Sequence, residues 1–257
     1  MIGHFPPHEC YVEPFGGAAS ILLQKPLSPL EVYNDLDSGV VNFFKVLRER
    51  PEEFIRAVQL TPMSREEYNL AWELSDDALE MARRFYVRAW QARRGPSTQR
   101  KSGWRFQRTN TRHKKTTDDF NEIDGLWSIV ARLKEVQIEN DEGTKVIQRF
   151  DSQQTLFYVD PPYLTQVRSG SWAKCCYVHE MTDDQHKNLA EVLHSVKGKV
   201  VISGYPSKLY EQLYSGWPSY TKRSRTEMNF FRVEQIWVSP NCFTSGQLRM
   251  SENEGSH

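Results

Sequence analysis

Short apolar segments alternate with segments of helical periodicity along most of the chain. Such alternation predicts a mostly parallel β-sheet with helices on both faces, as in Rossmann-like α/β folds. The predicted strands are Cys10–Phe15, Glu31–Tyr33, Val136–Glu139, Thr155–Val159, Lys199–Ser203 and Glu234–Val238. The predicted helices include residues 18–24, 126–133, 143–150, 183–196 and 207–214.

The composition limits the classes of protein that this chain can belong to. Of its 257 residues 39% are hydrophobic, which is enough for the core of one α/β domain with a large insertion. No apolar run approaches the roughly 18–20 residues that cross a bilayer, and the N-terminus is too polar for a signal peptide, so we expect a cytoplasmic protein. Neither the four cysteines nor His179, His186 and His194 have metal-ligand spacing, so we expect no metal.

Positive charge is concentrated in one part of a chain whose formal net charge is zero. Residues 83–117 contain 12 Lys and Arg side chains and no Asp or Glu. A solvated charged surface normally mixes both signs, whereas a localised cationic segment on an acidic body is typical of a site for a polyanion. The segment therefore predicts a nucleic-acid contact.

The basic segment belongs to an insertion between the second and third predicted strands. Residues 59–125 are predicted to be helical at first, with Asp76-Asp77 as a helix cap, and then irregular. Ligands bind beyond the carboxyl ends of the strands in such sheets. We predict a catalytic domain of residues 1–58 and 126–244, a recognition insertion of residues 59–125, and a disordered tail of residues 245–257.

The strongest chemical signal is the tetrapeptide Asp160-Pro161-Pro162-Tyr163, directly after an apolar strand. An aromatic amine is a poor nucleophile because its lone pair is delocalised into the ring. The Asp160 carboxylate and the Pro161 carbonyl could accept its two hydrogens and localise that lone pair. The two prolines stiffen the loop, and Tyr163 could stack on an extruded base. Taken alone, the tetrapeptide could also be an ordinary turn at a strand end.

Two further motifs follow the first and second predicted strands. The sequence EPFGGAAS, residues 13–20, places small residues at the start of a helix, where a cofactor can approach the backbone. It matches neither GxGxxG nor a P-loop. Asp35, about 20 residues later, could accept the hydroxyl groups of a ribose, while Asp37 could be a helix cap. Asn140-Asp141, after the third strand, could lie near an adenine or could begin a turn.

In their joint order, these motifs resemble the Dam-like, alpha-group DNA adenine methyltransferases, many of them from bacteria or phages. The resemblance runs from about Cys10 to Asn241 and rests on EPFGGAAS, NDLD, the basic insertion, YVDPPYL, VISGY and EQIWVSPN. It implies a Rossmann-like S-adenosylmethionine-dependent methyltransferase core with an inserted small helical DNA-recognition domain. It also implies methyl transfer to the exocyclic amino group of adenine in duplex DNA, after the base is flipped out.

The resemblance and the motifs together assign expected roles to individual residues. Residues 203–205 would line the wall of the active-site cleft. The catalytic residues would be Asp160, Pro161, Pro162 and Tyr163. The cofactor-binding residues would be Glu13, Pro14, Phe15, Gly16, Gly17, Ala18, Asp35, Asn140, Asp141 and Asp160. The DNA-binding residues would be Arg88, Arg93, Arg94, Arg100, Lys101, Arg105, Arg108, Arg112, Lys114 and Lys115.

One departure from the family keeps two alternatives open. The family opens with a glycine pair and a lysine that help to close the cofactor pocket, and residues 1–9 contain no lysine. Weak cofactor binding is therefore expected, and a catalytically impaired DNA-binding remnant is one alternative. The other is a methyltransferase for RNA adenine, cytosine or protein glutamine, although an acidic first position, Asp160, favours adenine in DNA. Both a monomer and a dimer are compatible with the sequence.

Overall fold

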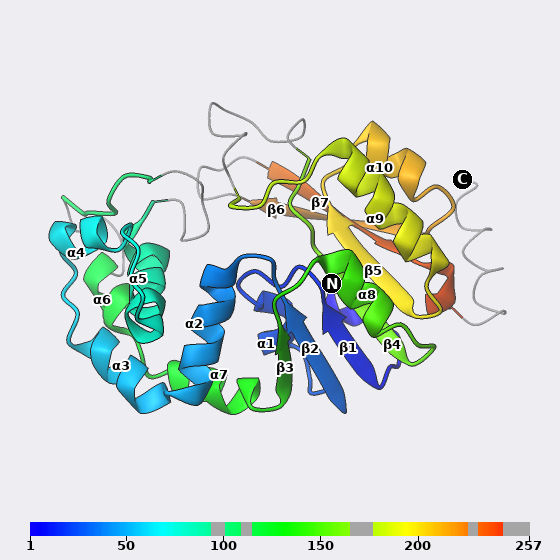
Figure 1. Cartoon of the computed structure of the whole chain (residues 1–257). Coiled ribbons are helices and arrows are strands. Elements are labelled where there is room, and N and C mark those ends of the chain that lie inside the picture. The colour runs from blue at the N-terminus through cyan, green and yellow to red at the C-terminus, as the bar shows by residue number, and fades with distance from the viewer. Residues whose placement is uncertain (94–100, 109–114, 165–176, 226–230, 244–257) are drawn as a thin grey trace. The chain divides into compact units, whose positions relative to one another are not determined.

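The computed structural model describes residues 1–93, 101–108, 115–164, 177–225 and 231–243 (Figure 1). The predicted disordered tail, residues 245–257, lies outside these residues. The chain forms two compact units. The first unit comprises Met1–Leu36, Asp141–Lys174 and Glu180–His257, and the second comprises Asp37–Asn140 and Cys175–His179. The division of labour predicted for residues 59–125 and the rest of the chain stays a prediction.

The first unit is built on six strands of a seven-stranded sheet, and the seventh strand, β3 (Val136–Glu139), belongs to the second unit. The six strands lie in the order β2-β1-β4-β5-β7-β6. Their bounds are β1 (Cys10–Glu13), β2 (Leu30–Asn34), β4 (Thr155–Val159), β5 (Lys199–Gly204), β6 (Ser219–Arg225) and β7 (Phe231–Val238).

The centre of this sheet is parallel. Val12 of β1 is paired with Val32 of β2 on one side and with Phe157 of β4 on the other, and Phe157 is paired in turn with Val200 of β5. Strand β7 is antiparallel to β5, and β6 is antiparallel to β7. The predicted Rossmann-like α/β fold is confirmed.

Strand β6 is the one strand that the sequence did not predict. Its sequence, SYTKRSR, offers Tyr220 as its only large apolar residue, so it lacks the apolar signal of a buried strand. It lies at the edge of the sheet, where polar and charged residues are tolerated and discourage pairing with another chain.

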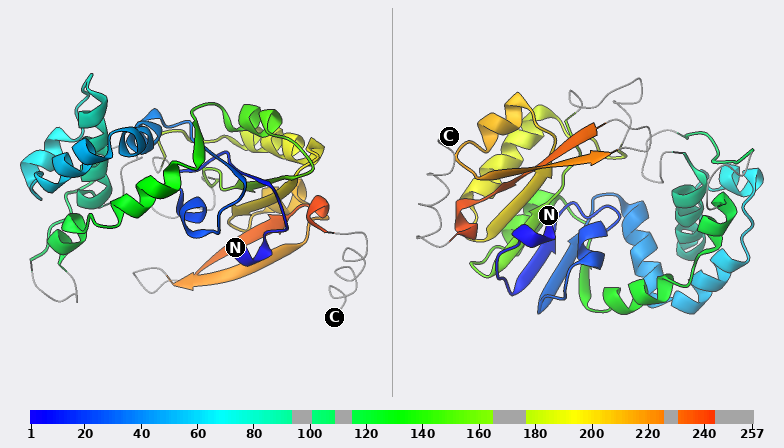
Figure 2. Two further views of the ribbon diagram at one scale, coloured as in Figure 1. Left: turned by 90° about the horizontal axis from the view of Figure 1, so that it is seen from below. Right: turned by 180° about the vertical axis from the view of Figure 1, so that it is seen from behind.

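Helices α8 (Gly143–Arg149), α9 (Asp183–Ser195) and α10 (Lys208–Leu213) lie over one face of the sheet (Figure 1). Ile147 and Leu193 of these helices pack with Phe157 and Ile202 in one buried cluster. The N-terminal end of the chain lies on the other face of the sheet (Figure 2). There the ring of Phe5 lies 5.7 Å from the rings of Tyr11 and Tyr158. The remaining elements of this unit are η1 (Ile2–His4), α1 (Ser20–Gln24) and η4 (Pro240–Cys242).

In the described residues of the second unit, the regular elements are helices apart from β3. Its helices are α2 (Ser38–Glu49), α3 (Pro51–Gln59), α4 (Arg65–Leu70), α5 (Ala78–Gln91), α6 (Thr116–Asn121) and α7 (Leu126–Leu133). Helix α5 packs against α2, α3, α4 and α6, and Asp77 caps it as predicted by accepting the N–H of Leu79. The buried rings of Phe44, Phe54 and Phe85 form its core.

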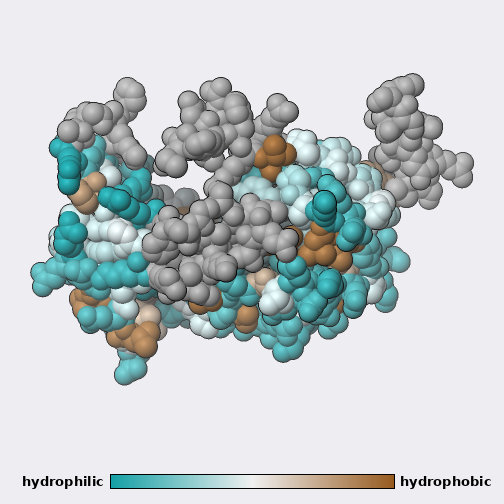
Figure 3. Space-filling model, turned by 90° about the horizontal axis from the view of Figure 1, so that it is seen from above, coloured by the Kyte–Doolittle hydropathy of each residue, from teal (hydrophilic) through white to brown (hydrophobic). Residues whose placement is uncertain are grey.

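The visible surface is mostly hydrophilic, with separate hydrophobic patches rather than one continuous apolar face (Figure 3). Among the described helices, none is long and apolar enough to span a membrane.

Candidate active site

The two motifs that follow β1 and β4 come together in the first unit. Because β2 lies on one side of β1 and β4 on the other, the chain order reverses between β1 and β4. In open α/β sheets, ligands bind beyond the carboxyl ends of the strands at such a reversal. The glycine loop, residues 14–19, and the tetrapeptide of residues 160–163 both begin at this edge of the sheet.

The glycine loop is folded against the end of β2. A Cβ atom at Gly16 would lie 2.2 Å from the ring of Tyr33, so only glycine fits there. Gly17 has a φ of +48° and lies on the surface, and its N–H donates to the Asp35 carboxylate at 2.8 Å. The Tyr33 hydroxyl donates to the Gly17 carbonyl at 2.7 Å. The loop therefore presents its backbone outward, beside Asp35.

Asn34 holds the loops together. This side chain is fully buried, and its amide donates to the carbonyls of Pro14 at 2.8 Å and Asp141 at 3.0 Å. Its oxygen accepts the N–H of Asp141 at 2.9 Å. The sequence had marked Asn34 only as the residue before Asp35. Its spacing gives no signal of this role, because the partner at 141 is 107 residues away.

Phe15 lies against the start of α8, which follows Asp141. A Cβ atom at Gly143 would lie 2.7 Å from Cζ of Phe15, so the ring lies directly on this glycine. The Asp141 carboxylate accepts from Arg149 at 2.9 Å, and this hydrogen bond, with the N–H of Glu142, lowers the pKa of Asp141. Asn140, counted with the second unit, accepts from the Ser38 hydroxyl at 3.0 Å.

Glu13, predicted to bind the cofactor, points into the protein. Its carboxylate is buried and accepts the Tyr11 hydroxyl at 2.6 Å. Burial, together with the nearby Asp160 charge, raises the pKa of Glu13 to about 7 against the opposing hydrogen bonds from Tyr11 and Leu22. Glu13 thus supports the end of β1 from within.

Asp160 is held by the end of β5. The buried hydroxyl of Ser203 donates to the Asp160 carboxylate at 2.9 Å. Burial raises the pKa of Asp160, whereas hydrogen bonds from Ser203 and Tyr163 lower it, and the charge of Glu234 raises it. The two hydrogen bonds therefore favour the ionised carboxylate, the form that accepts hydrogen bonds with both oxygens.

The ring of Tyr163, directly after the two prolines, packs against the ring of Tyr205. Tyr163 and Tyr205 lie with their ring centroids 4.5 Å apart and their planes at 60°. Pro161 is buried and Pro162 is half-buried. The backbone between Asp160 and Tyr163 is therefore restricted in its conformation. Tyr205 follows β5 directly, as Tyr163 follows the β4 loop, and the two rings form one edge of the site.

The predicted DNA-binding residues that the structure describes fall into three groups. Arg88 is partly buried: it donates to the Ala71 carbonyl at 2.5 Å and packs against Trp72. Arg93 and Arg108 lie over the ring of Phe106, at 5.7 and 5.5 Å from its centroid. Lys101, Arg105 and Lys115 form the third group, in which the two lysines are exposed and Arg105 is half-buried. Arg94, Arg100, Arg112 and Lys114 lie outside the described residues.

The count of 12 Lys and Arg side chains in residues 83–117 overstates the positive charge that is available for a ligand. Arg83 forms ion pairs of 2.7 Å with Glu67 and Glu80, and Arg84 pairs with Glu80 at 2.7 Å. Both glutamates lie outside residues 83–117. The two arginines are therefore paired, although the segment itself contains no acidic residue. Conversely, Arg65 lies outside the segment yet stacks over the ring of Trp104 at 4.7 Å.

The comparisons with known proteins identify the family. The model of the D12 class N6 adenine-specific DNA methyltransferases matches residues 2–229. No curated protein matches the chain. Among the described residues, no group of His, Cys, Asp and Glu side chains could hold a metal ion. Members of this family use S-adenosylmethionine as methyl donor and act on adenine in DNA, which decides among the amine substrates left open above.

The chain therefore belongs to the D12 class N6 adenine-specific DNA methyltransferase family, and it is an enzyme that methylates adenine in DNA with S-adenosylmethionine.

Proposed function

We propose that this enzyme orients the adenine amine with Asp160 and Pro161, binds its cofactor on the glycine loop, and recognises duplex DNA with the basic insertion. The observation that carries the proposal is the hydrogen bond of 2.9 Å from Ser203 to Asp160. It fixes a half-buried carboxylate at the end of β4, beside the strand that carries the glycine loop.

The edge of β1 and β2 fits a nucleoside cofactor. The backbone of Gly17 lies on the surface with no atom within 4 Å of the position of a side chain, and the Asp35 carboxylate next to it has the chemistry to accept ribose hydroxyls. Phe15, Gly16, Gly17, Asp35 and Asp141 would hold S-adenosylmethionine. When bound, the cofactor supplies an electrophilic methyl group on a sulfonium.

The tetrapeptide supplies what the amine requires. The Asp160 carboxylate accepts one N–H of the amine and the Pro161 carbonyl accepts the other, so the nitrogen lone pair becomes available for the methyl carbon. Because the two prolines restrict the backbone conformations of the loop, both acceptor oxygens keep their directions. Acceptors that are already in place need no reorganisation during the reaction. Tyr163, beside Tyr205, provides an aromatic face for the base.

The insertion, residues 59–125, would bind duplex DNA. Its described cations include Lys101, Arg105, Arg108 and Lys115, and phosphate contacts from such side chains give affinity and register. The catalytic domain, residues 1–58 and 126–244, would carry out the transfer.

Calorimetry with S-adenosylmethionine tests the cofactor site. We expect Asp35→Ala to weaken binding by about tenfold or more, because a charged hydrogen-bond partner is worth roughly 1.5–3 kcal/mol. Duplex DNA affinity should be unchanged. The exposed surface variant Asp184→Ala is the control. Equal cofactor affinity in the wild type and Asp35→Ala would contradict the site.

A further inference from the structure

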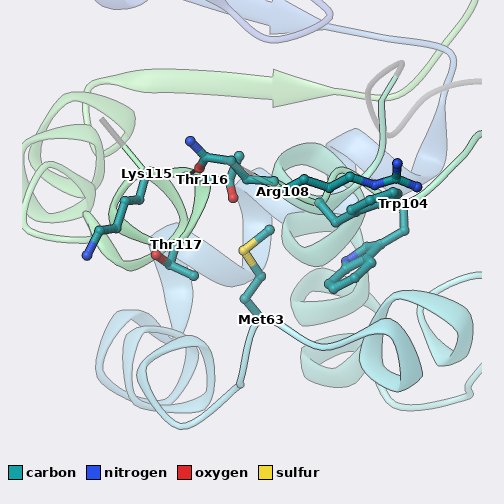
Figure 4. Close-up of a pocket in the computed structure, with 8 residues that line it drawn as sticks. Met63, Trp104, Arg108, Lys115, Thr116 and Thr117 are labelled. Carbon is teal, nitrogen blue, oxygen red and sulfur yellow. Dashed lines mark hydrogen bonds between the residues drawn. The ribbon is translucent and has the colours of Figure 1, made fainter. Parts of the chain in front are cut away.

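The second unit contains a cavity that the methyl-transfer chemistry does not use. It has a volume of about 360 Å³, within the roughly 300–1,000 Å³ typical of small-molecule sites. Met63 lies between Trp104 on one side and Thr117 on the other (Figure 4). The lining residues are Met63, Trp104, Phe106, Gln107, Arg108, Lys115, Thr116 and Thr117.

The aromatic wall of this cavity is fixed from behind. The Trp104 indole donates to the buried side chain of Gln91 at 3.1 Å. Backbone hydrogen bonds join Arg93 to Gly103 at 3.0 Å and Arg105 to Gln91 at 2.7 Å. The chain that carries Trp104 is therefore held against the end of α5 before any ligand binds.

The two rings of this wall form a stacking surface. Trp104 and Phe106 have ring centroids 5.9 Å apart with planes inclined by 24°. Phe106 remains 37% exposed, although the guanidinium groups of Arg65, Arg93 and Arg108 all lie within 6 Å of its centroid. An exposed ring of this kind is ready to stack on a planar aromatic ligand.

The charge of the cavity selects the class of ligand. Arg108 and Lys115 line it, Arg65 and Arg93 flank Phe106, and no Asp or Glu is among the lining residues. Asp118 is close, but its carboxylate accepts the backbone N–H of Lys115 at 3.3 Å. An aromatic surface surrounded by cations matches a nucleobase with its phosphate.

We propose that this cavity binds one unpaired nucleotide of the DNA substrate, with its base on Phe106 and Trp104 and its phosphate at Arg108 and Lys115. The inference rests on the proposed role of the basic insertion. Paired bases in a duplex already stack on their neighbours and cannot offer a face to Phe106, whereas an unpaired base can. Extrusion of the target adenine leaves the opposite base unpaired, so the reaction itself supplies such a nucleotide.

The test compares two labelled duplexes of one sequence, of which one carries a single unpaired thymine as a bulge. Thymine is chosen because it is not the base that the enzyme methylates. At equal salt, the wild type should bind the bulged duplex about 5- to 100-fold more tightly than the perfect duplex, as base–aromatic stacking predicts. Phe106→Ala should remove this preference, so that the two duplexes bind within about twofold of each other.

Two further variants separate the cavity from general folding effects. Thr117→Trp fills the cavity from an exposed position of α6 and leaves Phe106 and the cations in place. It should also remove the preference. Trp127→Ala removes an aromatic side chain that is 47% exposed in the same unit but outside the cavity, and should retain it.

Three results would overturn the inference: equal binding of both duplexes by the wild type, a preference that survives in both Phe106→Ala and Thr117→Trp, or its loss in Trp127→Ala. A different result would show that the insertion does not bind duplex DNA at all. In that case Arg108→Ala would leave the affinity for the perfect duplex unchanged, whereas failure of the cavity alone would leave that dependence intact.

Discussion

The ring of Phe15 lies directly on Gly143, where a Cβ atom would come within 2.7 Å of Cζ and 3.0 Å of Cε2. Phe15 belongs to the glycine loop after β1, and Gly143 begins α8 after the Asn140-Asp141 motif. These two parts of the proposed cofactor site therefore pack together through the Phe15 ring, which occupies the space that a side chain at position 143 would need.

We predict that Gly143→Ala displaces Phe15 and weakens S-adenosylmethionine binding by about tenfold, since overpacking by one methyl group costs roughly 1–3 kcal/mol. Calorimetry measures the affinity, and a thermal melt checks that the variant is folded at the temperature used. Gly125→Ala is the matched control, because no atom lies within 4 Å of a Cβ atom there. Unchanged affinity in Gly143→Ala would show that Phe15 is not part of the cofactor site.

A second prediction concerns the pH dependence of methylation. The ionised form of Asp160 accepts hydrogen bonds from Ser203, and this contact lowers the pKa of Asp160 against the effect of burial. Ser203→Ala removes it, so the pKa of Asp160 rises and the carboxylate becomes protonated at a higher pH. The acid limb of the kcat profile should therefore move to higher pH, with little change on the alkaline side.

The control for this profile is Ser215→Ala, an exposed serine of the same unit. Its acid limb should coincide with that of the wild type. If the profile of Ser203→Ala is merely scaled down with no displacement, then Ser203 acts only as a packing residue and the prediction is wrong.

The third prediction concerns salt. Each cation that neutralises one DNA phosphate contributes about 0.9 to the slope of log affinity against log salt concentration. Arg108→Ala and Lys115→Ala should each reduce the slope for a perfect duplex by about that amount. Lys45→Ala, which removes an exposed cation of α2 in the same unit, should leave the slope unchanged. Identical slopes for all variants would place the phosphate contacts elsewhere.

The arrangement of the motifs could be predicted because it depends on local patterns. Apolar strands before EPFGGAAS and before Asp160 indicated a parallel sheet, and parallel neighbours bring their carboxyl ends to one edge. The position of the glycine loop beside Asp35 follows from the same rule. These inferences needed only the order of short segments along the chain.

Contacts between residues far apart in sequence could not be predicted in this way. Nothing local marks Asn34 as the partner of Asp141, or Arg65 as a neighbour of Trp104. The charge of residues 83–117 was misjudged for the same reason, because the acids that pair with Arg83 come from earlier helical residues. Strand β6 escaped because an edge strand needs no buried apolar run.

The role of the Asp160 carboxylate is tested most directly by the methylation rate of Asp160→Asn. The substitution keeps the size of the side chain but replaces one acceptor oxygen by an NH2 donor. The adenine amine then loses a hydrogen-bond acceptor in the methyl-transfer step, whereas the binding of cofactor and duplex does not depend on that acceptor. We predict that kcat falls by about 10²–10³-fold, while the affinities for S-adenosylmethionine and duplex DNA stay within about threefold of the wild type. A variant that keeps a tenth or more of the wild-type kcat would contradict the account.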